Sequence, residues 1–183
     1  MKKDLGSKPY IFPQPVLIIA TYNEDSSANA MNAAWGGITG YDELVIDLGS
    51  HKTTDNIMRT KAFTVSIGDV DHVVQCDYVG LVSGRKVTDK LERAGFSVTP
   101  SRFVNAPVIN ELPLALECTL EKTDGSKIYA KIANVCADES ILDKEGQVDL
   151  SLFRPVVYDT SKLGYYSLGE RVAAAFSAGK AVK

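Results

Sequence analysis

The feature that most constrains the fold is a pair of long segments, residues 114–123 and 127–137, separated by a turn signal. Asp124 and Gly125 stand at the junction, and glycine tolerates the positive φ that tight hairpin turns require. We therefore predict two antiparallel strands joined by a short turn. Such a hairpin favours a fold built mostly from strands that are neighbours in the sequence.

Four further strands are predicted before the hairpin, at residues 16–20, 29–35, 44–48 and 63–67. The first is a continuous apolar run, and the last alternates with the period of two that is typical of a strand. Six or more strands, many of them adjacent, predict a mainly β (α+β) fold, namely a β-barrel with short helical insertions. No repeat or linker divides the sequence, so we expect one domain over residues 1–183 with its core at about 13–178.

Helices are expected in four places between or after the strands. Thr53 and Thr54, followed by an acidic and an amide residue, are typical of a helix start, and a second helix is expected at residues 70–79. Residues 82–104 predict a long excursion with a short helix near 89–94, and a closing helix is predicted at residues 170–176. Long excursions in compact domains are often functional.

Composition excludes several classes of protein. Of the 183 residues, 45% are hydrophobic and 23% are charged, which is typical of a globular chain and argues against disorder. The net charge of -3, with no run of Lys or Arg, argues against a nucleic-acid partner. No apolar run reaches the roughly 18 residues of a membrane helix, and no signal sequence is evident. Three cysteines without a CxxC pair favour reduced thiols, and we expect a cytoplasmic protein without membrane association.

Common catalytic templates find no support in this sequence. It contains no GxGxxG, Walker A or GxSxG motif, so Rossmann-type dinucleotide binding, P-loop chemistry and elbow-type hydrolysis are not indicated. His51 and His72 are the only histidines, which excludes a site of several histidines, and no metal site is expected.

The helix start at residues 50–56 is the first candidate for binding chemistry. A phosphate monoester is bound by hydroxyl donors, a cation and free backbone N–H groups at a helix N-terminus. This segment offers such groups in Ser50, Lys52, Thr53, Thr54 and Asn56. The alternative is an ordinary capped helix with a solvated lysine.

Two further segments carry candidate residues. In the segment Asn29-Ala30-Met31-Asn32-Ala33-Ala34-Trp35-Gly36-Gly37, small residues and amides would let a flat ring lie against the backbone, although core packing is the alternative. In residues 83–90, Ser83 begins a loop that could place Arg85, Lys86 or Lys90 over an anionic cofactor. The alternative there is an exposed basic loop.

In their order along the chain, these blocks resemble the flavin reductase-like, FMN-binding split-barrel family, and most closely its flavoredoxins. The resemblance runs from about residue 15 to 176. It rests on Thr21-Tyr22, the segment 29–37, Thr53-Thr54-Asp55-Asn56-Ile57, Lys61-Ala62-Phe63-Thr64-Val65-Ser66-Ile67, Asp77-Tyr78-Val79-Gly80, Ser83-Gly84-Arg85-Lys86-Val87, Leu112-Pro113-Leu114 and Tyr165-Tyr166.

The resemblance implies a homodimer of split β-barrels with one FMN per subunit near the boundary between them. By similarity, Asn29, Trp35 and the residues between them hold the isoalloxazine ring, and the helix start around Thr53 meets the phosphate. The resemblance also implies that Lys90 approaches the flavin. Lys86 is the alternative for this role, because the sequence carries one extra residue between Val87 and Lys90. Tyr165 is expected to contact the ring. Lys127 replaces a histidine that relatives often carry, so no role passes to that position.

Three functions are compatible with this resemblance. The first is an FMN-dependent oxidoreductase of the NAD(P)H:flavin reductase type, with NADH or NADPH as co-substrate and no side chain acting as nucleophile or general base. The second is an FMN electron carrier that serves an electron-accepting protein without its own nicotinamide turnover. The third is a binding module without redox chemistry, because fold alone does not determine function.

Overall fold

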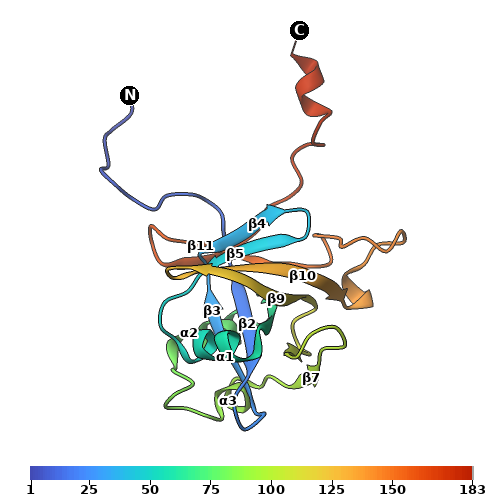
Figure 1. Cartoon of the computed structure of the whole chain (residues 1–183). Coiled ribbons are helices and arrows are strands. Elements are labelled where there is room, and N and C mark those ends of the chain that lie inside the picture. Colours follow the sequence, from blue (N-terminus) through green and yellow to red (C-terminus); the bar gives the residue numbers. More distant parts are fainter. Residues whose placement is uncertain (183) are drawn as a thin grey trace.

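The computed structural model describes residues 1–182, and its largest element is a seven-stranded antiparallel sheet (Figure 1). The strand order is β3-β2-β6-β9-β10-β5-β4. The strands are β2 (Leu17–Tyr22), β3 (Ala28–Ala33), β4 (Gly36–Gly40), β5 (Glu43–Asp47), β6 (Ala62–Ile67), β9 (Leu114–Asp124) and β10 (Lys127–Ala137). The predicted hairpin is confirmed, with Asp124 opposite Lys127 and Gly125 at φ 58° in the turn.

The sheet curls into a barrel that is split between its two edge strands. β3 and β4 lie at opposite ends of the strand order, yet only Ala34 and Trp35 separate them in the chain. A sheet whose edges are joined by so short a link must bend round on itself. The mainly β fold with short helices is therefore confirmed, and Trp35 lies at the split.

Smaller elements complete the fold. Helices α1 (Lys52–Thr60), α2 (Val73–Leu81) and α3 (Lys90–Ala94) confirm three of the predicted helices, although α2 begins three residues later than expected. A small three-stranded sheet contains β1 (Gln14–Pro15), β11 (Val156–Asp159) and β12 (Gly164–Ser167). A two-stranded sheet contains β7 (Val98–Pro100) and β8 (Pro107–Ile109). Two short 3-10 helices are η1 (Glu139–Ile141) and η2 (Ala178–Ala181).

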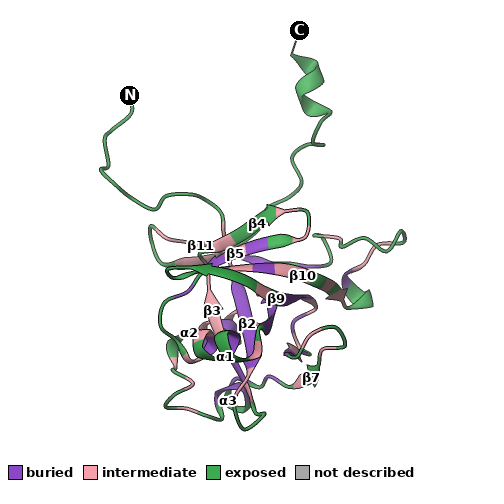
Figure 2. Cartoon of the chain, in the orientation of Figure 1, coloured by how far each residue is buried: buried purple, intermediate pink, exposed green. Residues whose placement is uncertain are grey.

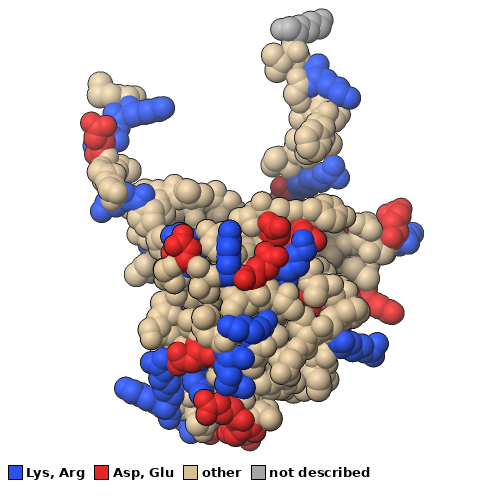
Figure 3. All heavy atoms as spheres, viewed as in Figure 1, with Lys and Arg blue, Asp and Glu red and all other residues tan. Residues whose placement is uncertain are grey.

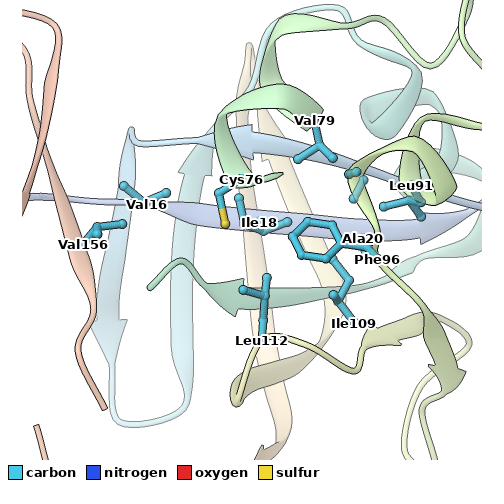
Figure 4. Packing of buried hydrophobic residues seen from close by; sticks show 12 residues of the cluster. Val16, Ile18, Ala20, Cys76, Val79, Leu91, Phe96, Ile109, Leu112 and Val156 are labelled. Carbon is cyan, nitrogen blue, oxygen red and sulfur yellow. The ribbon is translucent and has the colours of Figure 1, made fainter. Parts of the chain in front are cut away.

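Buried side chains form two cores, one on each face of β2. Val16, Ile18 and Ala20 pack outside the barrel against α2 and α3, with Cys76 and Val79 of α2 among their neighbours (Figure 4). Leu17 and Ile19 point the other way, into the barrel interior. Because both faces of β2 are buried, its sequence is apolar without alternation.

The barrel interior is filled from several strands and closed by one helix. Phe63 of β6 and Ile57 of α1 are both fully buried there. Interior-facing side chains fill small barrels in this way. Helix α1 therefore covers one end of the barrel interior.

The predicted helix at residues 170–176 is wrong. Residues 168–182 are exposed; residues 168–171 lie beside the loop at 143–154, and the chain then extends away from the body with only the short turn η2 near the end (Figures 1 and 2). Val172 and Phe176 are almost fully exposed. A short segment with no surface to pack against gains too little to pay the cost of helix nucleation.

Several elements were not anticipated from the sequence. Gly36 and Gly37, expected only to follow a strand, begin the edge strand β4. A Cβ on Gly36 would lie 2.7 Å from the Val45 carbonyl oxygen, so glycine allows β4 to approach β5 closely. The small sheets containing β1, β7, β8, β11 and β12 also went unpredicted, because strands of two to four residues carry little periodic signal.

Candidate functional site

Helix α1 begins without a side-chain cap. Its N-cap residue, His51, makes no capping hydrogen bond through its side chain. The first N–H groups of a helix have no partner within the helix, so an uncapped start attracts an anion. Ser50 is exposed beside this start and Lys52 is half-buried there. Of the donors predicted in residues 50–56, Ser50, Lys52, Thr53 and Thr54 therefore lie at the start of this helix.

The hydroxyl groups at this helix start have different surroundings. Thr54 donates to the Gly49 carbonyl oxygen at 2.7 Å, which fixes the turn before α1. Thr53 is 1% exposed and its oxygen accepts a hydrogen bond from Asn29 at 2.8 Å. That bond leaves the hydroxyl hydrogen of Thr53 for another acceptor. Thr53 thus connects α1 directly to β3.

Asn56 points away from the helix start. It is 1% exposed, and its amide nitrogen lies 3.0 Å from the Thr21 hydroxyl and 2.8 Å from the Asn23 side-chain oxygen. Both amide hydrogens are used within the chain, because an amide nitrogen carries only two. The structure therefore gives Asn56 the position of a residue that holds α1 against β2, rather than one that faces a ligand.

Strand β3 lies at the edge of the sheet, so one side of its backbone has no strand partner. Because side chains alternate along a strand, Asn29 and Asn32, three residues apart, point to opposite faces. Asn29 reaches Thr53 of α1, and Asn32 reaches the Cys76 carbonyl oxygen of α2 at 3.0 Å. Ala30 is fully buried in the outer core and offers a ligand only its backbone, whereas Met31 packs against the inner core and is partly exposed.

A cavity of about 380 Å³ lies between the end of β3, helix α2 and strand β12. Among the predicted site residues it collects Asn32, Ala33, Trp35 and Tyr165 in one place. It is also lined by Asp77, which the sequence reasoning did not select. In the sequence, Asp77 is marked only by its place in the Asp77-Tyr78-Val79-Gly80 block of the family resemblance.

A second hollow, of about 420 Å³, lies beside the first turn of α1. Lys52 lines it, together with Gly84, Arg85 and Thr88 from the loop after α2 and with Asn23, Glu24 and Asp25 from the turn after β2. Figure 3 shows basic and acidic side chains together in the part of the molecule where this loop and α3 lie. The hollow is therefore polar, and its two basic side chains are balanced by two acidic ones.

The loop at residues 82–89, which connects α2 to α3, lies against both α1 and strand β3. Arg85 forms an ion pair with Asp55 of α1 at 2.8 Å, and Gly84 lies so close to β3 that a Cβ would come within 2.1 Å of the Asn29 side-chain oxygen. Ser83 is exposed and its hydroxyl accepts from the Arg85 backbone N–H at 3.3 Å. Of the two lysines considered for the flavin, Lys86 is exposed in this loop and Lys90 is buried behind it.

Lys90 is a buried cation without a carboxylate partner among the described residues. It is 3% exposed, and its ammonium group donates to the carbonyl oxygens of Val79 and Val82, both at 3.1 Å. These carbonyls end helix α2, where a positive charge is favourable. Burial lowers the pKa of Lys90 to about 8, because the charged form loses its hydration. Lys90 thus stabilises the helix end, and its charge lies near Gly84 and Asn29.

The lowered pKa of Lys90 predicts a pH dependence of stability. The folded-state pKa lies below the ordinary value of 10.5, so the unfolded chain binds more protons between these two values and stability rises with pH across that window. Relative to a Lys90→Met variant, we expect the free energy of unfolding to increase by about 1 kcal/mol from pH 7.5 to pH 9. Urea unfolding of both chains at several pH values measures it, and parallel pH profiles would contradict the prediction.

Other polar groups do not form a recognised centre. Lys127 is exposed at the start of β10 and lines neither cavity. In the part of the chain that the structure describes, no group of three or more His, Cys, Asp or Glu side chains is placed to hold a metal ion. Within residues 1–182, no helix is both long and apolar enough to cross a membrane.

Comparison with known proteins gives a family and close structural relatives. The family model described as "Flavin reductase like domain" matches residues 9–166. Flavoredoxin of Desulfovibrio vulgaris (Miyazaki F) is 35% identical, superposes with a TM-score of 0.94, and the match covers 98% of this chain and 100% of that one. Flavoredoxin of Methanosarcina acetivorans is 26% identical, with a TM-score of 0.89 and full coverage of both chains.

A third similar structure is the 2-nitrobenzoate 2-nitroreductase of Pseudomonas fluorescens, 25% identical with a TM-score of 0.79 over 90% of this chain and 85% of that chain. The resemblance predicted from the sequence blocks is therefore confirmed, including its similarity to flavoredoxins. The chain belongs to the flavin reductase-like domain family.

Proposed function

We propose that this chain is an FMN-dependent oxidoreductase that accepts a hydride from NADH or NADPH and passes electrons onward. The single observation that carries the proposal is the Asn29–Thr53 hydrogen bond, which ties the uncapped start of α1 to the free edge of β3. The donors suited to a phosphate and a strand suited to a flat ring are thus held together. FMN carries both a phosphate and a planar ring.

The residues present fit such a cofactor at both of its ends. The α1 start, with Ser50, Lys52 and Thr53, provides N–H, O–H and ammonium donors for a phosphate. The unpaired edge of β3 provides backbone N–H and C=O groups for the polar edge of a ring, beside a cavity that Trp35 and Tyr165 line. When bound, FMN supplies the hydride and electron chemistry, and the protein supplies orientation and electrostatics.

Membership of the flavin reductase-like domain family supports a flavin cofactor. A structure with the same fold, 19% identical to this chain, is described as an FMN-binding domain of flavin reductase-like enzymes from Shewanella baltica. Lys90 adds buried positive charge close to Asn29, which favours an anionic ligand or a ring that gains negative charge.

The phosphate site is tested by two ligands that differ only in the phosphate. We expect FMN to bind at least about tenfold more tightly than riboflavin, because the charge-assisted bonds at the α1 start are absent for riboflavin. Replacing Lys52 with alanine should narrow this difference several-fold, whereas Lys144→Ala, an exposed lysine in a distant loop, should not. Flavin fluorescence titrations give the affinities. Equal affinities for FMN and riboflavin in the natural chain would contradict the phosphate site.

An electron carrier is the second candidate function. It is favoured by the similarity to two proteins named flavoredoxin, and it requires an electron-accepting protein as partner. Anaerobic stopped-flow mixing of the FMN-loaded chain with NADH or NADPH separates the two functions. Rapid loss of the oxidised flavin absorbance supports the oxidoreductase, while no reduction by either nucleotide supports the carrier.

We also propose that the chain works as a homodimer in the cytoplasm. The edge strand β4 and its ends expose three large apolar side chains, Trp35, Ile38 and Tyr41, and exposed edges of this kind favour pairing with a second copy. The free cysteines suit a reducing compartment. Light scattering on the purified chain measures its mass, and a monomer at micromolar concentration would contradict the dimer.

A further inference from the structure

A hydrogen-bond network lines one corner of the cavity between β3, α2 and β12. Tyr165 donates to the Asp77 carboxylate at 2.7 Å. The Asn32 amide nitrogen donates to the Cys76 carbonyl oxygen at 3.0 Å and to the Tyr165 hydroxyl oxygen at 3.3 Å. Asn32, Asp77 and Tyr165 all line the cavity, so the network forms part of its wall.

The partners determine where the hydrogens of this network lie. A backbone carbonyl only accepts, so Asn32 must turn its nitrogen toward Cys76 and keep its oxygen away from it. A carboxylate also only accepts, so Tyr165 must donate its single hydrogen to Asp77. Burial, reinforced by Asp77, raises the pKa of Tyr165 well above its ordinary value, and the phenol keeps that hydrogen across the neutral range.

At this corner the three side chains of the network, Asn32, Asp77 and Tyr165, therefore offer acceptors only. Both amide hydrogens of Asn32 and the hydroxyl hydrogen of Tyr165 are used within the network. Among the described residues, no donor is recorded for the second oxygen of Asp77 or for the side-chain oxygen of Asn32. The other polar side-chain atoms of the lining, the indole N–H of Trp35 and the hydroxyl of Tyr158, lie outside this network.

We propose that this corner selects a flat aromatic ring that carries a carboxamide and rejects the same ring carrying a carboxylate. A carboxamide brings N–H groups that can donate to these free acceptors. A carboxylate has no hydrogen to donate and would bring a second negative charge close to Asp77. The inference rests on the proposed function, since the nicotinamide ring of NADH and NADPH carries a carboxamide. It makes Asp77 a specificity-determining residue of the cavity.

Benzamide and benzoate test the proposal because they have the same shape and differ in donors and charge. Binding to the purified full-length chain, with and without added FMN, is followed by calorimetry and by the emission of Trp35, which is the sole tryptophan. We expect benzamide to bind at least about tenfold more tightly than benzoate. In the Asp77→Asn variant, which removes the charge and adds an N–H donor, the ratio should fall close to one.

The control variant is Asp71→Asn, which removes the same charge from an exposed residue just before α2. It should keep the benzamide preference of the natural chain. Equal affinities in the natural chain, an unchanged ratio in Asp77→Asn, or no binding of either probe would overturn the proposal. Failure of the proposed function is distinguishable, because the FMN and nicotinamide experiments measure it separately. A benzamide preference that Asp77→Asn abolishes supports the selective corner whatever those experiments give.

Discussion

Replacing Phe63 with alanine is expected to lower the free energy of unfolding by about 3–5 kcal/mol. Phe63 is fully buried in the barrel interior, where it packs with side chains of several strands and with Ile57 of α1. Truncation removes the transfer free energy of the ring and leaves a cavity that a closed barrel cannot collapse to fill. Urea unfolding followed by circular dichroism measures the loss.

Phe103→Ala is the matched control, because Phe103 is 60% exposed in the loop between β7 and β8. The same truncation there should change the free energy of unfolding by about 0.5 kcal/mol or less. Similar losses at both positions would mean that the barrel interior is not the main core. Such a result would also remove the reason for the position of α1, which closes this interior.

Replacing Gly84 with alanine is expected to damage the candidate site and weaken FMN binding by about tenfold, because the new methyl group must displace Asn29. Its Cβ would lie 2.1 Å from the side-chain oxygen of Asn29. Asn29 is 3% exposed and is held by its bond to Thr53, so its side chain has no free space to move into. The same strain should lower the free energy of unfolding by about 1–3 kcal/mol.

Gly37→Ala is the control for this change, because a Cβ at Gly37 would meet no atom within 4 Å. FMN titration and urea unfolding of both variants measure the two effects. Normal FMN affinity in Gly84→Ala would show that the loop and Asn29 can separate without cost to the site. In that case the Asn29–Thr53 bond would no longer support the proposed cofactor position.

Much of the fold was predictable because its signals are local. The Asp124-Gly125 turn, the alternation in β6 and the start of α1 near Thr53 each depend on a few neighbouring residues, and the structure contains all three. The wrong helix at residues 170–176 had a local pattern too. It failed because a helix that short depends on tertiary packing, and Val172 and Phe176 have none.

The candidate site was predictable only in part. The residues at the α1 start and along β3 were selected from their types and order, and the structure places Thr53 against Asn29 and groups Asn32, Trp35 and Tyr165 in one cavity. Asn56 and Lys90 were chosen by the same reasoning, yet both amide hydrogens of Asn56 and two of the three ammonium hydrogens of Lys90 are used within the chain. Residue type alone does not reveal whether a polar side chain faces a ligand or forms its hydrogen bonds with another part of the same chain.

The sequence by itself determined the class of fold, the order of the strands along the chain and the segments that carry binding chemistry. Only the tertiary structure decided that β3 is an edge strand, that Trp35 lies at the split of the barrel, and that Asp77 and Tyr165 share a hydrogen. The physical reason is distance along the chain. Turns and periodicity act over a few residues, whereas Asp77 and Tyr165 are 88 residues apart and meet only when α2 and β12 pack around β3.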